Sequence, residues 1–253
     1  MGTRYGATAS VGGGNTWYDS YHSPTGSSII PFFIPALQNH GRNKTVQLTD
    51  PGAGKSVLSA SIVDGLLKLE GVVVLYFFFR NGDTSTTAPS EMAASIISQL
   101  INSAGGTDRE RLLRILKEVV HHGAPFADRG RNFKTLWKAF GDMLQVHSSR
   151  VIVLLDALDE CSHPASVSGG VLQVEAGARF LVTGRPVVRD LLEDKPNVST
   201  IKMNVGEDIS KFITEKVAKI KSLEHHADAI IHTVNENSAG MFRYAGAYMH
   251  LIL

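Results

Sequence analysis

The sequence predicts an α/β fold in which a parallel β-sheet lies between two layers of α-helices. Three segments support this prediction. Residues 44–48 alternate between polar and apolar side chains and lead through a glycine-rich turn into a helical pattern of apolar residues from Val57 to Leu69. Residues 151–155 and 180–182 are continuous apolar runs, which is typical of strands buried on both faces. We expect this core to occupy residues 41–204.

The turn between the first strand and the first helix is typical of a phosphate-binding loop. Its sequence, TDPGAGKS, occupies residues 49–56. Gly52 and Gly54 allow the backbone to wrap around phosphate oxygens, so that N–H groups and the positive end of the helix dipole point at the anion. Lys55 is predicted to reach the β- and γ-phosphates, and Ser56 to ligate Mg²⁺. The nucleotide contacts are expected from Asp50, Pro51, Gly52, Ala53, Gly54, Lys55, Ser56 and Val57.

The loop departs from the GxxxxGK[ST] pattern at its first position, where Thr49 replaces glycine. A β-branched residue fits poorly there if the turn requires a positive φ. A second interpretation therefore stays open, in which the chain is a scaffold with a degenerate loop that does not hydrolyse nucleotide. The choice between ATP and GTP also stays open, because the motif contacts phosphates and not the base.

A second motif follows the apolar run at residues 151–155 and consists of acidic residues. Asp156 ends the strand, and the carboxyl ends of parallel strands are where α/β sheets bind their ligands. Asp156 is therefore predicted to hold Mg²⁺ together with Ser56, usually through water. Glu160 is expected to polarise the attacking water, and Asp159 to assist the metal or orient that water.

A third motif, RFLVTGRP, occupies residues 179–186 and ends another buried strand. Thr183 and Arg185 are expected at the carboxyl edge of the strand that neighbours the acidic motif. An arginine there can bind the γ-phosphate and report whether it is present. Pro186 suits the first turn of the helix that follows.

Together, these motifs resemble the NACHT nucleotide-binding domain of fungal NOD-like receptors, which are signalling P-loop NTPases of the STAND class. The resemblance covers about residues 44–250 and includes GMFRYA at residues 240–245. It implies a cytosolic switch that hydrolyses nucleoside triphosphate slowly and whose nucleotide state controls assembly into a homo-oligomer, in innate-immunity-like responses. It assigns Lys55 and Ser56 to the Walker A motif, Arg185 to the sensor, and Asp156, Asp159 and Glu160 to the Walker B motif.

The predicted elements also divide the chain. Residues 1–40 are rich in Gly, Ser, Thr and Tyr and are expected to form a flexible lead. A strand at residues 72–79 lies between the first two motifs, as in the additional-strand class of P-loop proteins, which form three-layer αβα sandwiches. Residues 205–253 are expected to form a small helical subdomain. The resemblance implies further winged-helix or repeat segments in the full receptor.

Composition narrows the choice of partners. The 253 residues carry 25 basic and 24 acidic side chains, so no overall field favours nucleic acid or an anionic membrane. No run approaches the ~20 apolar residues that a membrane span needs, and the first residues lack the pattern of a signal peptide. Cys161 is the only cysteine, which excludes an internal disulfide. These observations favour a cytoplasmic protein that binds neither nucleic acid nor membrane.

Overall fold

The computed structural model describes residues 44–48, 52, 54–122, 132–202, 206–220, 225–238 and 240–252. The predicted N-terminal lead, residues 1–40, lies outside the described residues. The same holds for four residues of the phosphate-binding loop, namely Thr49, Asp50, Pro51 and Ala53.

Five parallel strands form one sheet in the order β2-β3-β4-β1-β5. Strand β4 lies between β1, which leads into the phosphate-binding loop, and β3, which ends in the acidic motif. This order confirms the predicted α/β fold of the additional-strand P-loop class. The strands are β1 (Lys44–Leu48), β2 (Val72–Phe78), β3 (Arg150–Asp156), β4 (Ala178–Gly184) and β5 (Val198–Lys202).

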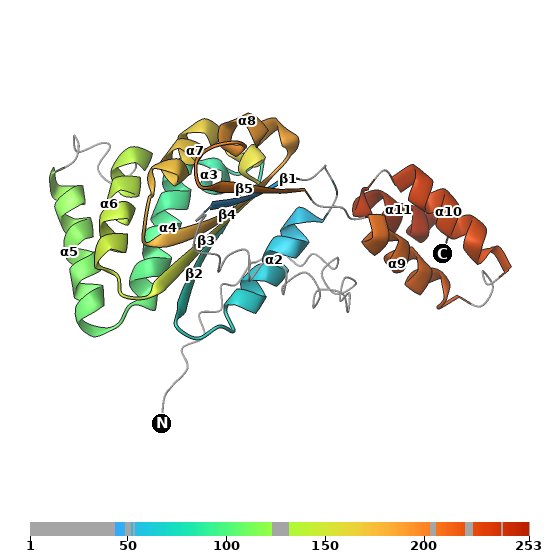
Figure 1. Cartoon of the computed structure of the whole chain (residues 1–253), viewed down its shortest axis with the longest axis horizontal. Coiled ribbons are helices and arrows are strands. Elements are labelled where there is room, and N and C mark those ends of the chain that lie inside the picture. Colours follow the sequence, from blue (N-terminus) through green and yellow to red (C-terminus); the bar gives the residue numbers. More distant parts are fainter. Residues whose placement is uncertain are drawn as a thin grey trace, which may run out of the picture.

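Helices cover both faces of the sheet, as Figure 1 shows. Helix α2 (Lys55–Leu66) lies on one face, and the larger helical layer lies on the other. The larger layer contains α4 (Pro89–Ser103), α5 (Gly106–His122), α6 (Phe133–Val146) and α7 (Pro164–Gln173). Short elements complete the core: α3 (Thr84–Thr87), the 3₁₀ turns η2 (Leu158–Glu160) and η3 (Pro186–Val188), and α8 (Arg189–Leu192).

Strand β3 shows why the sheet is buried on both faces. Val153 and Leu155 pack into the core beneath α4, α6 and α7, whereas Ile152 and Leu154 pack against α2. Successive side chains of a strand point to opposite faces, so a continuous apolar run supplies both cores at once. The three-layer αβα sandwich follows directly from this pattern.

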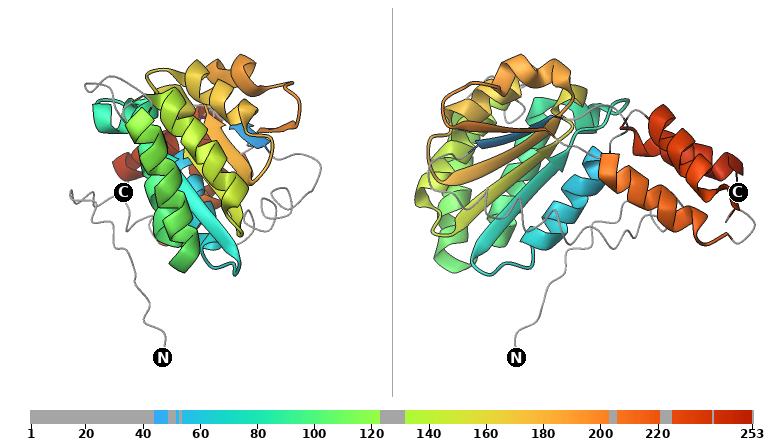
Figure 2. Two further views of the ribbon diagram at one scale, coloured as in Figure 1. Left: turned by 90° about the vertical axis from the view of Figure 1, so that its left-hand side faces the viewer. Right: turned by 45° about the vertical axis from the view of Figure 1, so that its right-hand side comes forward.

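Three further helices follow the sheet and have a core of their own. They are α9 (Gly206–Val217), α10 (Ala227–Ser238) and α11 (Phe242–Ile252). Ile209 and Ile213 of α9 pack against Val234 of α10 and Met249 of α11. Figure 2 shows this helical cluster beside the end of the sheet that carries the phosphate-binding loop. The exact division of the chain at residues 204 and 205 stays a prediction.

Helix α7 is the element of the larger layer that periodicity does not predict. Its sequence, PASVSGGVLQ, has few apolar residues, and the apolar side chains that it buries are those of Val167 and Val171.

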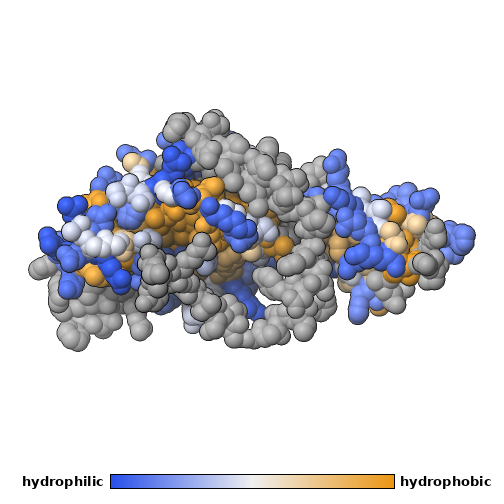
Figure 3. Space-filling model, turned by 90° about the horizontal axis from the view of Figure 1, so that it is seen from below, coloured by the Kyte–Doolittle hydropathy of each residue, from blue (hydrophilic) through white to orange (hydrophobic). Residues whose placement is uncertain are grey.

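Seen from below in Figure 3, apolar side chains reach the surface over the core and over the helical cluster. No helix in the described ranges is long and apolar enough to cross a membrane.

Candidate nucleotide-binding site

The phosphate-binding loop joins the carboxyl end of β1 to the first turn of α2. Gly52 and Gly54 have φ values of +77° and +83°, in the left-handed region that favours glycine. Gly54 is the N-cap of α2, so the N–H groups of the first helical turn point towards the loop. Val57, in the first turn of α2, exposes 48% of its surface, and its contact with nucleotide stays a prediction. This geometry suits an anion at the start of α2.

Asp156 lies directly beside this turn, at the end of β3, with only 1% of its surface exposed. Three hydroxyl groups donate hydrogen bonds of 2.6 Å to its carboxylate, from Ser56 to Oδ2 and from Ser59 and Thr183 to Oδ1. Thr183 Oγ1 also accepts the backbone N–H of Ala157 at 3.0 Å. These contacts fix the buried carboxylate against α2 and β4, at the place where the sequence predicts a metal site.

Backbone strain follows immediately after Asp156. Ala157 has a φ of +56°, which is unusual for a residue with a side chain. The chain then forms the η2 turn, which contains Asp159 and Glu160. Strained residues of this kind persist where the surrounding structure fixes them, and they concentrate at functional sites.

Both acids of η2 have defined partners. Asp159 Oδ1 accepts the backbone N–H of Arg185 at 2.9 Å, and its Oδ2 lies 3.0 Å from Arg185 Nε. Glu160 Oε2 accepts the backbone N–H of Asn81 at 2.8 Å, and its Oε1 lies 4.0 Å from Arg185 Nη2. Asp159 therefore holds Arg185, while Glu160 lies between the ends of β2 and β4.

Lys55 lies among these charges and is half-buried. Burial is the largest influence on its pKa and lowers it, the carboxylate of Asp159 raises it, and Arg185 lowers it again. A cation that is partly desolvated in this way gains more from a bound polyanion than a cation in water does.

The donor chemistry of the site suits Mg²⁺. The Ser56 hydroxyl and the Asp156 carboxylate are 2.6 Å apart, and both offer oxygen atoms, the ligands that this ion prefers. Ser56 and Asp156 would hold the ion beside the phosphates. When bound there, the ion would neutralise phosphate charge.

Two residues that contact the acidic motif are not predicted by the motifs. Ser59 is a buried residue on the apolar face of α2, three residues after Ser56. A serine among the apolar residues of this face is visible in the sequence and could have indicated a polar partner inside the core. Asn81 contributes only its backbone N–H, which no sequence pattern marks.

The start of α11 also contacts the loop. The N–H of Arg243 donates to the carbonyl oxygen of Gly52 at 3.3 Å. A Cβ atom placed on Gly52 would lie 3.4 Å from Cβ of Met241, and one placed on Gly54 would lie 3.7 Å from the ring of Phe242. The helical cluster therefore touches the phosphate-binding loop through residues 241–243.

Solved structures with a similar fold share little sequence with this chain. The chain resembles the Orc1 protein of Aeropyrum pernix in complex with DNA at 12% identity and a TM-score of 0.49, covering 87% of this chain and 56% of that one. It resembles the Drosophila origin recognition complex bound to DNA at 14% identity and a TM-score of 0.49, covering 87% and 52%. It resembles a STAND protein with a tetratricopeptide repeat sensor from Pyrococcus horikoshii at 14% identity and a TM-score of 0.45, covering 88% and 32%.

This chain thus spans between 32% and 56% of the length of those structures. No curated protein sequence matches it. Residues 36–185, which include the phosphate-binding loop, the acidic motif and Arg185, match the model of the family described as Nephrocystin 3, N-terminal. The match covers more than half of the chain, and the chain therefore belongs to the Nephrocystin 3, N-terminal family, with a P-loop NTPase fold.

Proposed function

We propose that this chain is a nucleoside triphosphate-binding switch that depends on Mg²⁺ and hydrolyses its nucleotide slowly. The observation that carries this proposal is the convergence of Lys55, Ser56 and Asp156 at one edge of the sheet, beside the N-terminus of α2. A cation, a hydroxyl group and a buried carboxylate in this arrangement match the three needs of a Mg²⁺-bound polyphosphate.

The residues have distinct roles in the proposed hydrolysis. The N–H groups of the loop and Lys55 would bind the β- and γ-phosphates, and Ser56 and Asp156 would hold the Mg²⁺ ion, which would neutralise phosphate charge. Glu160 takes a proton from the water that attacks the γ-phosphorus. The bond between the γ-phosphorus and the β–γ bridging oxygen breaks, so the products are a nucleoside diphosphate and inorganic phosphate.

Arg185 and residues 241–243 give the switch its two states. Arg185 lies at the edge of β4 and would exchange part of its contact with Asp159 for the γ-phosphate. The contact of Arg243 and Gly52 would pass a change in the loop to the helical cluster. This exchange would promote homo-oligomer formation in a cytosolic NOD-like receptor, as the resemblance implies, with ATP and GTP both candidate ligands. Neither nucleic acid nor a membrane is an expected partner.

A scaffold that binds nucleotide without turning it over is the second candidate, because Thr49 replaces the first glycine of the motif. Release of phosphate from ATP and GTP separates the two. A switch with slow hydrolysis shows release above background that disappears in Glu160→Gln, while nucleotide still raises the melting temperature of both proteins. Stabilisation by nucleotide without release from the wild type supports the scaffold.

A further inference from the structure

The carboxylate of Glu160 is held through one of its two oxygen atoms by the turn that follows β2. Oε2 accepts the backbone N–H of Asn81 at 2.8 Å, whereas Oε1 faces Arg185, with 4.0 Å between Oε1 and Nη2. A general base has to lie within hydrogen-bond reach of the water that it activates. The bond to Asn81 therefore turns Oε1 to the side of Arg185, where the γ-phosphate and its attacking water are expected.

Asn81 lies outside the sheet, in the turn between β2 and α3. The pairing of β2 with β3 continues one residue beyond β2, where the N–H of Phe79 donates to the carbonyl oxygen of Asp156 at 3.0 Å. Asn81 follows two residues later and offers Glu160 its backbone N–H. The direction of this N–H therefore depends on the hydrogen bonds that close the turn.

Thr86 of α3 closes the turn. Its hydroxyl donates to the carbonyl oxygen of Arg80 at 2.8 Å and lies 3.0 Å from that of Asp83, and its own carbonyl oxygen accepts the N–H of Arg80 at 3.2 Å. The carbonyl of Arg80 and the N–H of Asn81 belong to the same peptide group. Because a peptide group is planar, a bond that fixes its C=O also fixes the direction of its N–H. Thr86 and Glu160 thus hold the two sides of one peptide plane.

Helix α3 is in turn anchored to the chain that carries Glu160. Ser162 donates twice to the carbonyl oxygen of Thr87, through its N–H at 2.9 Å and through its hydroxyl at 3.1 Å. At the start of α3, Asp83 Oδ1 accepts the N–H of Ser85 at 2.9 Å, which stabilises the first turn of the helix. The turn after β2 and the acidic motif are therefore joined on both sides of the carboxylate.

We infer that Thr86 is a positioning residue for Glu160. Its hydroxyl orients the peptide group between Arg80 and Asn81, and this peptide group holds Glu160 with Oε1 directed towards the attacking water. Thr86 acts through the backbone of the turn and touches neither the water nor the nucleotide in this role. The inference deepens the proposed hydrolysis and rests on it.

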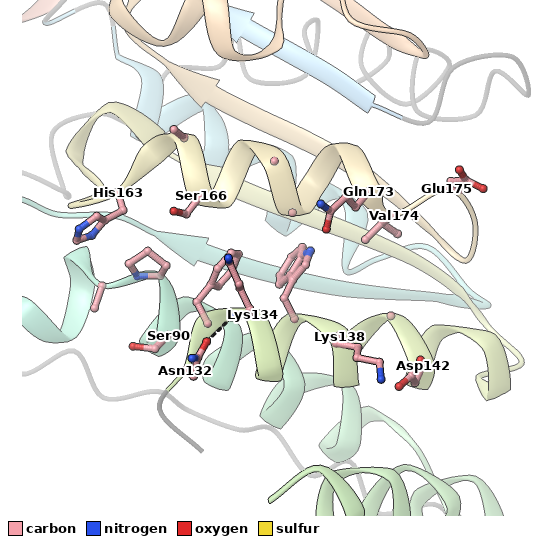
Figure 4. Close-up of a pocket in the computed structure, with 18 of the residues that line it drawn as sticks. Ser90, Asn132, Lys134, Lys138, Asp142, His163, Ser166, Gln173, Val174 and Glu175 are labelled. Atoms are coloured by element: carbon pink, nitrogen blue, oxygen red, sulfur yellow. Dashed lines mark hydrogen bonds between the residues drawn. The ribbon is translucent and has the colours of Figure 1, made fainter. Parts of the chain in front are cut away.

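Thr86 is a better position for a test than Ser162, because Ser162 also lines a groove between α6 and α7. Figure 4 shows this groove from His163, at the start of α7, to Glu175, beyond its end. Thr86 does not line the groove. A change of its side chain therefore reaches Glu160 through the turn and leaves the groove as it is.

Amide exchange in the full chain without nucleotide tests the contact by itself. The exchange rate of the Asn81 N–H, followed by NMR, should rise at least tenfold in Thr86→Val, which replaces the hydroxyl by a methyl group. Thr86→Ser keeps the hydroxyl and should restore a rate close to that of the wild type. Glu160→Ala gives the rate of the N–H without its acceptor, which Thr86→Val should approach.

Thr84→Val is the matched control. Thr84 is exposed on the same short helix, and its hydroxyl has no hydrogen-bond partner in the described part of the chain. The change from threonine to valine is the same as at position 86. It should leave the exchange of the Asn81 N–H unchanged.

Phosphate release tests the consequence, with Mg²⁺ and with ATP or GTP, whichever the chain binds. Thr86→Val should lower kcat at least tenfold and leave KM within about twofold, because the change affects the attacking water and not the bound nucleotide. Thr86→Ser and Thr84→Val should keep the kcat of the wild type. All variants should keep their nucleotide-induced rise in melting temperature.

The two measurements separate the possible failures. An Asn81 exchange rate in Thr86→Val equal to that of the wild type overturns the inference, and so does an unchanged kcat. A rise in KM with unchanged kcat would place Thr86 in nucleotide binding and overturns it as well. A wild type that binds nucleotide and releases no phosphate contradicts the proposed hydrolysis instead, and amide exchange then decides whether Thr86 orients the peptide group that holds Glu160.

Discussion

Arg185 makes two contacts with the carboxylate of Asp159. Its backbone N–H lies 2.9 Å from Oδ1 and its Nε lies 3.0 Å from Oδ2. The side chain of Asp159 is only 4% exposed, whereas that of Arg185 is 47% exposed. The buried acid therefore holds the base of the arginine, while much of the guanidinium remains accessible. A γ-phosphate would compete with Asp159 for this cation.

Asp159→Asn is expected to raise the preference for triphosphate over diphosphate. The change removes the charge that holds Arg185, so less free energy is needed to turn the guanidinium towards the γ-phosphate. Arg185→Ala should abolish the preference, because a charge-assisted hydrogen bond to phosphate contributes about 1.5 to 3 kcal/mol, or tenfold to a hundredfold in affinity. Isothermal titration with both nucleotides measures the ratio.

Glu193→Gln is the control for this pair, since Glu193 Oε2 lies 3.0 Å from Arg189 Nε in an ion pair outside the site. It should leave the ratio of affinities unchanged. If the ratio of triphosphate to diphosphate affinity is the same in the wild type and in Arg185→Ala, Arg185 is not a sensor of the γ-phosphate.

Gly54→Ala should impair nucleotide binding more than it impairs folding. Its φ of +83° costs an alanine roughly 1 to 2 kcal/mol, and the added methyl group would lie at the loop beside Phe242. Gly71→Ala is the matched control, because Gly71 has a φ of +71° and open space around it in the described structure. Urea unfolding should show similar destabilisation of both, while only Gly54→Ala loses affinity. Equal loss of affinity in both variants would contradict the assignment of the loop.

The lowered pKa of Lys55 predicts a pH dependence of binding. Burial disfavours the charged amine in the protein without nucleotide, and bound phosphates favour it, so binding raises this pKa. Between the lowered and the raised pKa, nucleotide binding takes up a proton. Affinity should therefore fall as the pH rises through this window.

Lys55→Arg tests the origin of this effect, because arginine does not titrate in the range. Titration calorimetry in two buffers with different ionisation enthalpies counts the protons that binding takes up. If the affinity of the wild type and that of Lys55→Arg depend on pH in the same way, another group is the origin of the dependence.

The sequence predicts the three strands β2, β3 and β4 well because each contains a continuous apolar run. Residues 151–155 of β3 need no knowledge of their neighbours to be identified as a buried strand. Helix α7 is different, since it is rich in Ser and Gly and its place depends on packing against α6 and on the sheet. Local propensity decides little in such a segment.

Within the site, the residues of the loop and of the acidic motif could be located from spacing. Their interactions could not, because Asp159 was expected to assist the metal or the water, and in the structure it holds Arg185. The contact of Arg243 with Gly52 joins residues 191 positions apart, and only the placement of the helical cluster reveals it.

Titration of fluorescent ATP and GTP analogues with Mg²⁺ tests the central claim most directly. The wild type should bind at least one of them, and Lys55→Ala should bind it at least tenfold more weakly while its melting temperature without nucleotide changes little. Equal and weak binding of both analogues by the two proteins would contradict the assignment of this loop as a nucleotide site.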